Sequence, residues 1–186
     1  MSTHIDISPI SPSLVGYLTR LYSQTNSSTP IAATVSELSL LDGGVGSKVI
    51  PANGFQVGDS FRAVLIGHIS SANNETLRIR VKAGSIVLAD TLAMTLPATA
   101  TKHWKIEIDF TIRTIGAAGV ASIASGGMFT YSKTASAAFE GVGFSGINNT
   151  TFDTTISNEL FVTGQWGSTN ATNSIFSEIF TLTKTY

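Results

Sequence analysis

The chain has 186 residues, of which only 12% are charged, with a formal net charge of −1 and no cysteine. The absence of cysteine excludes disulfides, thiolate metal sites and a cysteine nucleophile, and the scattered Lys and Arg form no basic stripe for nucleic acid. No apolar run approaches the roughly 18 residues of a membrane span, and residues 1–10 lack the pattern of a signal peptide, so we expect no membrane insertion.

The low charge has two interpretations. A weakly charged surface suits a protein that packs against copies of itself, because few charged groups must then lose their water. Alternatively, a β-rich composition simply disfavours Lys and Glu.

The N-terminal segment 1–13 has no periodicity and contains Pro9 and Pro12, which predicts an extended arm. Residues 14–186 are predicted to form a single β-sandwich domain. Residues 14–22 suit either a short helix or, in their second half, a strand, which we prefer. Residues 31–41 are predicted to be a strand that ends before the glycine-rich turn 42–46.

Residues 61–69 are apolar on two faces, which predicts a strand covered on both sides. Turns at Asn73-Asn74 and Gly84-Ser85 lead into strands at 77–83 and 86–92, so the three strands are expected to form a meander.

Residues 104–113 alternate between large apolar and polar side chains without interruption. This period of two predicts a strand with one buried face, which carries Trp104 into the core. With further strands at 128–132, 160–166 and 175–184, the chain contains about nine or ten strands and no convincing long helix. The predicted fold is all-β, an antiparallel two-sheet sandwich with jelly roll as the preferred topology. A long barrel or a fibre-like β-prism would give the same alternation.

No motif names a reaction. His4, His68 and His103 lack metal-ligand spacing, and no serine lies in Gly-x-Ser-x-Gly. Glu107 and Asp109 share a strand face as some glycosidase carboxylates do, but neighbouring basic residues on that face favour a solvated charge ladder. We therefore predict no catalytic residues, no metal, no cofactor and no enzymatic activity.

Three other features have both a functional and a structural interpretation. The small-residue run 115–127 fits either a self-association surface or a hairpin loop that leads into a strand. Trp166 precedes Gly167 and a polar loop, so its ring is expected to be exposed, and Trp166 and Asn170 are the candidates for glycan contact. Phe139 and Phe144 could form another exposed rim. Sequons at Asn148 and at four other asparagines are candidates for glycosylation: Asn26, Asn74, Asn149 and Asn170.

The candidates for self-association are apolar residues in strands with two apolar faces or near the C-terminus: Val64, Ile66, Phe161, Phe176 and Phe180. A second apolar face must be buried by something, either by the second sheet of the same subunit or by another subunit.

From residue 21 to residue 186 the chain resembles β-sandwich virion structural proteins of tailed phages and of giant double-stranded DNA viruses, the capsid-associated or fibre type. Short strand and turn segments carry the resemblance: Ile50-Pro51-Ala52-Asn53-Gly54, Val57-Gly58-Asp59-Ser60-Phe61-Arg62, Leu88-Ala89-Asp90-Thr91, residues 104–113 with Ile115-Gly116, Phe152-Asp153-Thr154-Thr155, Leu160-Phe161-Val162-Thr163 and Asn173-Ser174-Ile175. The resemblance brings no catalytic residues.

What the resemblance implies is a non-enzymatic structural role in a virion, as a capsid-associated or fibre component. The sparse charge, the strands with two apolar faces and the small-residue run 115–127 together predict self-association into a symmetric homo-oligomer, preferably a trimer. The chain's expected partners are other copies of itself and other virion proteins. The alternative is a lectin-like host-attachment module that binds host glycans.

Overall fold

The computed structural model describes residues 20–133 and 138–186, so the predicted arm 1–13 lies outside the described residues. Within these ranges the chain forms strands and turns, and no helix capable of spanning a membrane occurs there. The strands are β1 (Arg20–Gln24), β2 (Ile31–Ala32), β3 (Leu38–Ser39), β4 (Gly44–Gly46), β5 (Val49–Ile50), β6 (Ser60–Ser71), β7 (Glu75–Ala83), β8 (Ile86–Asp90), β9 (Met94–Leu96), β10 (Thr99–Thr114), β11 (Ser122–Ser132), β12 (Phe139–Asn148), β13 (Asn158–Trp166) and β14 (Ser174–Lys184).

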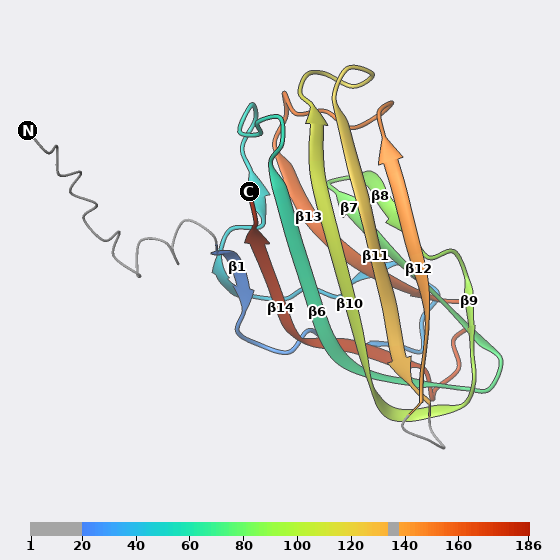
Figure 1. Cartoon of the computed structure of the whole chain (residues 1–186). Coiled ribbons are helices and arrows are strands. Elements are labelled where there is room, and N and C mark those ends of the chain that lie inside the picture. The colour runs from blue at the N-terminus through green and yellow to red at the C-terminus, as the bar shows by residue number, and fades with distance from the viewer. Residues whose placement is uncertain (1–19, 134–137) are drawn as a thin grey trace, which may run out of the picture.

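The strands form two antiparallel sheets. The large sheet has the order β12-β11-β10-β6-β14-β1-β4, with β2 also paired to β14. The small sheet has the order β3-β13-β7-β8, with β5 and β9 paired to β13 and β7. Figure 1 looks onto the outer face of the large sheet, and β13, β7 and β8 lie behind it. The predicted all-β, two-sheet antiparallel sandwich is confirmed.

The core lies between the sheets because each long strand turns every second side chain inward. In β10, Trp104, Ile106 and Ile108 are at most 1% exposed, while Lys105 and Asp109 on the opposite face are exposed. The small sheet contributes its own inward series from β7 and β13. The predicted burial of Trp104 is therefore confirmed, and the largest fully buried side chains come from both sheets and the loops: Trp104, Trp166, Phe129, Phe152 and Phe180.

The connections differ from those expected in two places. The pair 61–69 and 77–83 is not part of one meander, because β6 lies in the large sheet and β7 in the small one. Asn74, with a φ of 59°, lies in the turn where the chain crosses between the sheets. Conversely, β10, β11 and β12 follow one another as a meander within the large sheet, and the jelly-roll topology is not confirmed.

Two segments were assigned wrongly from the sequence. Residues 31–41 form only the short strands β2 and β3, because Ala33, with a φ of 46°, turns the chain from the large sheet towards the small one. Strand β12 was not predicted at all, although it pairs with β11 over its full length.

A β-bulge in β14 reverses the inward and outward order of its side chains. The pairing of β14 with β6 shifts between Ser177 and Ile179, opposite Gly67. A Cβ at Gly67 would lie 1.9 Å from the Phe176 carbonyl oxygen, so only glycine allows this close approach. The Trp104 indole N–H donates to the carbonyls of His68 and Phe176, each at 3.1 Å, and so satisfies two acceptors beside the bulge. Trp104 thus fills the core and also holds β6 and β14 in this arrangement.

Candidate functional surfaces

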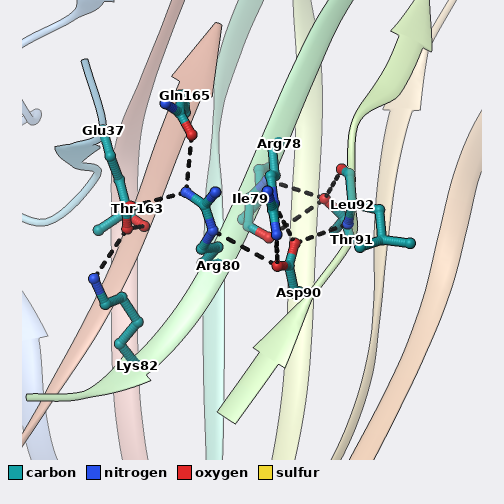
Figure 2. A network of polar contacts seen from close by, with 10 residues as sticks. All are labelled: Glu37, Arg78, Ile79, Arg80, Lys82, Asp90, Thr91, Leu92, Thr163 and Gln165. Atoms are coloured by element: carbon teal, nitrogen blue, oxygen red, sulfur yellow. Dashed lines mark hydrogen bonds and ion pairs between the residues drawn. The ribbon is translucent and has the colours of Figure 1, made fainter. Parts of the chain in front are cut away.

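The outer face of the small sheet carries a continuous network of charged side chains (Figure 2). Arg80 of β7 lies between two carboxylates, with Nη1 2.8 Å from Glu37 and Nε 3.6 Å from Asp90. Arg78 Nε donates to Asp90 at 2.8 Å, and Lys82 Nζ lies 3.1 Å from Glu37. The alternating cations of β7 are therefore shared between the acceptor from β8 and the acceptor from the segment before β3.

Neutral groups complete the coordination of these charges. The Thr163 hydroxyl donates to Glu37 at 2.7 Å, and Gln165 Oε1 accepts from Arg80 at 3.0 Å. The backbone N–H of Leu92 donates to Asp90 at 2.8 Å. Because each acid accepts hydrogen bonds from several donors, the network fastens the β3 segment, β13, β7 and β8 to one another.

The pKa values of Asp90 and Glu37 are both lowered from their ordinary values. Hydrogen bonds from Arg78 lower the pKa of Asp90, although burial opposes this shift. Burial raises the pKa of Glu37, but hydrogen bonds from Thr163 and Lys82 outweigh it, so the pKa of Glu37 is also lowered. A general acid needs a raised pKa, and a general base needs a carboxylate oxygen that is free to accept a proton. Both carboxylates have lowered pKa values and oxygens that already accept hydrogen bonds, so the arrangement fits a structural network. Sequence reasoning missed this network, since Glu37 lies in a loop before β3, distant in sequence from its partners Arg80 and Lys82.

The outer face of the large sheet is different, because apolar side chains lie on it. Val64 and Ile66 of β6 and Phe176 of β14 are partly exposed there, and Ile179 is 49% exposed. Ile66 lies directly opposite Ile179 in the β6–β14 ladder. We call these four residues the outer strip: Val64, Ile66, Phe176 and Ile179. Among the described residues the small sheet covers only the other face, so the strip faces solvent.

Three of the five predicted self-association residues thus share one surface, and two do not. Phe180 is 0% exposed, so its assignment to a surface was wrong: the bulge at Ser177–Ile179 places it inside although Phe176 lies outside. Phe161 lies on the outer face of the small sheet, where Lys48 Nζ is 5.2 Å from its ring centroid. Ile179 was missed because its outward direction depends on the same bulge.

The aromatic candidates for glycan contact do not form a surface platform. Trp166 is 1% exposed and its indole N–H donates to the Ile31 carbonyl at 2.9 Å, so the expectation that its ring is exposed was wrong. It lies in register with Leu160 and Val162 on the inner face of β13, which the alternation could have revealed. Asn170 is exposed in the loop before β14, where its Oδ1 accepts from the Thr172 backbone N–H.

Four of the five candidate glycosylation asparagines are exposed, and modification of them stays a prediction: Asn26, Asn74, Asn149 and Asn170. Asn148 is engaged instead, since its Oδ1 accepts from the backbone N–H groups of residues 150, 151 and 152.

Of the three histidines, His4 lies outside the described residues and the other two meet on the outer face of the large sheet. The rings of His68 and His103 have centroids 4.4 Å apart, and His68 Nδ1 lies 3.0 Å from Glu178. In residues 20–133 and 138–186 no group of three or more His, Asp or Glu side chains is arranged to hold a metal ion.

Glu107 and Asp109 lie on the outer face of β10 with basic partners. Lys105 Nζ is 2.8 Å from Glu107, and Arg62 Nε is 2.7 Å from Asp109. The predicted charge ladder is confirmed. The run 115–127 includes a turn and the start of β11, as the hairpin interpretation expected.

A small apolar cavity of about 50 Å³ lies between the sheets. Its lining includes Phe61, Phe110 and Leu160, with Lys48 and Glu159 beside them as an ion pair at 3.2 Å. Ligand pockets usually measure about 300–1,000 Å³, so this space is a packing gap.

Comparison with known proteins adds no assignment, because no protein-family model, curated protein or solved structure matches this chain.

Proposed function

We propose that the chain is a non-enzymatic structural protein of a virus particle, a β-sandwich that associates with copies of itself to build or decorate the particle. The observation that carries the self-association is the outer strip of Val64, Ile66, Phe176 and Ile179 on the large sheet. A sheet face with contiguous apolar side chains gains free energy when a partner covers it. The virion setting, as a capsid-associated or fibre component, rests on the sequence resemblance.

The strip fits burial against a like surface because the neighbouring charges are already paired. Val64 lies opposite Glu107, which has Lys105 as its partner, and Asp109 is paired with Arg62. A second copy would therefore bring apolar groups and neutralised pairs together, with little isolated charge to desolvate. The preferred oligomer is a trimer.

A glycan-binding head is the less favoured function, since burial of Trp166 removes the ring that would have stacked on a sugar.

The test introduces an aspartate on the outer strip and, as a control, on the small sheet. Ile66→Asp places a charge in the outer strip, whereas Val87→Asp places the same charge at a 42%-exposed valine on the small sheet. We expect Ile66→Asp to reduce the mass measured by light scattering while the protein stays folded, and Val87→Asp to leave the mass unchanged. Equal masses for both variants and the wild type, above that of a monomer, would contradict the role of the strip.

A further inference from the structure

Strand β12 forms the last strand of the large sheet, and its free edge is long (Figure 1). It pairs with β11 from Ser132↔Phe139 to Ile123↔Asn148 without a register shift. Among the described residues, no strand pairs with its other side. Such an edge presents a row of backbone donors and acceptors to any strand that can approach.

This edge lacks the features by which proteins usually protect their edges. Natural edge strands are short, bulged, or interrupted by Lys or Pro. The other terminal strands fit this description, since β4, β8 and β3 have 3, 5 and 2 residues. Strand β12 has 10 residues, contains no Lys, Arg or Pro, and carries one charge, Glu140, which is paired with Lys133. The unprotected edge is therefore a specific feature of β12.

The side chains of β12 are complementary to themselves in one antiparallel register. Its outer face carries two large apolar residues, Phe139 at 71% and Ile147 at 57% exposure, placed at equal distances along the strand on either side of Gly143. If two copies of β12 pair antiparallel about a two-fold axis at Gly143, Phe139 of each copy lies opposite Ile147 of the other. Small residues fill the positions between them, namely Gly141 and Ser145.

The same register also suits the inner face. There Val142 and Phe144 are only partly buried and pack at the rim of the core. The two-fold pairing places Val142 of one copy opposite Phe144 of the other, so both would gain cover. Glu140 would lie opposite Gly146, which avoids a like-charge pair.

We propose that β12 is a self-association edge: two copies pair through it about a two-fold axis at Gly143, and their large sheets join into one continuous sheet. The occupant is a second copy of this chain, because one register satisfies both faces at once. This inference rests on the proposed self-association and adds a contact separate from the outer strip. A protein that builds an extended assembly needs contacts of more than one kind, and an isologous two-fold contact is the commonest.

The sharpest test introduces charge at the axis. An added Cβ at Gly143 would meet its nearest atom at 3.9 Å, so Gly143→Lys is tolerated sterically, and it places two lysines opposite each other in the pair. The matched control is Gly126→Lys on the same outer face of β11, where the nearest atom lies at 4.0 Å. We expect Gly143→Lys to weaken the association at least tenfold, because like charges directly opposite each other oppose pairing. Gly126→Lys should associate as the wild type does.

Charge complementation then identifies the contact. Gly143→Asp alone should also fail to pair, whereas an equimolar mixture of the Lys and Asp variants should recover association, since opposite charges then meet at the axis. Failure of the mixture to associate, with both variants folded by circular dichroism, would overturn the two-fold pairing.

Amide hydrogen exchange of the wild type tests the edge without any substitution. Amides of β12 should exchange more slowly as the protein concentration rises. Protection independent of concentration would place a segment of the same chain on the edge and overturn the proposal.

The two proposals can fail separately. Association that Ile66→Asp disrupts but Gly143→Lys does not would refute pairing through β12 and leave the proposed function standing, whereas a wild-type monomer would refute both.

Discussion

The outer faces of the two sheets carry different kinds of side chains: paired charges on the small sheet and partly exposed apolar groups on the large sheet. On the small sheet, Arg78, Arg80 and Lys82 alternate along β7 and are bound by Glu37 and Asp90 into a network that belongs to the subunit. On the large sheet, the corresponding outward positions of β6 carry Val64 and Ile66, which remain partly exposed. The charges of one face are paired within the chain, whereas the other face keeps apolar side chains partly exposed and is the face that we propose a second copy covers. Strand alternation alone does not distinguish the two faces.

The largest expected effect concerns the core support of the large sheet. Trp104→Ala removes a ring that is 1% exposed and leaves two carbonyls beside the bulge without their donor. We expect it to lower the free energy of unfolding by about 3 to 5 kcal/mol. Denaturant titration measures this loss, and a change below about 1 kcal/mol would contradict the role given to Trp104.

The next largest effect compares the stability contributed by a carboxylate on each of the two outer faces. Asp90→Asn removes the negative charge and one of the two acceptor oxygens that Asp90 offers to Arg78 and Arg80 on the small sheet, and should cost about 1 to 3 kcal/mol. Its control is Asp109→Asn on the large sheet, where the carboxylate is 55% exposed and paired with Arg62. That variant should match the wild type in denaturant titration, because exposed pairs contribute little. Equal losses for the two variants would remove the distinction between a network and a surface ladder.

The network also predicts a dependence of stability on pH. The folded-state pKa values of Asp90 and Glu37 lie below their ordinary values of 3.8 and 4.5. Their contribution is therefore fully present above the ordinary values and is lost as the pH falls through the lowered, folded-state values. The wild type should lose stability as the pH falls from about 5 to about 3, the range in which these carboxylates become protonated. The double variant Asp90→Asn, Glu37→Gln should lose less stability over the same range, because it lacks both carboxylates. Parallel curves for this variant and the wild type would contradict the assignment.

How much the sequence predicted depended on the regularity of each strand. Strand β10 was found because its apolar side chains alternate without exception, and the burial of Trp104 followed directly. Strand β12 was missed because glycines occupy several of its alternate positions, which removes the contrast between its faces. The strand that was missed, β12, is therefore the long edge strand of the large sheet.

The errors at single residues have similar physical causes. Phe180 was placed on the surface because the bulge at Ser177–Ile179 leaves no sign in the spacing of Phe176 and Phe180. Gly67 on the facing strand was the only local hint, since an isolated glycine in a strand often marks a bulge. The pairing of Glu37 with β7 depends on a contact between distant segments, which strand periodicity cannot supply.

The central claim, that this sandwich associates with copies of itself, is tested most directly by its mass in solution. Light scattering behind size exclusion should be recorded for the wild-type chain over a dilution series that reaches high micromolar concentration. We expect a mass that rises with concentration above 19.5 kDa towards a defined multiple. A single species of 19.5 kDa throughout the series would contradict it.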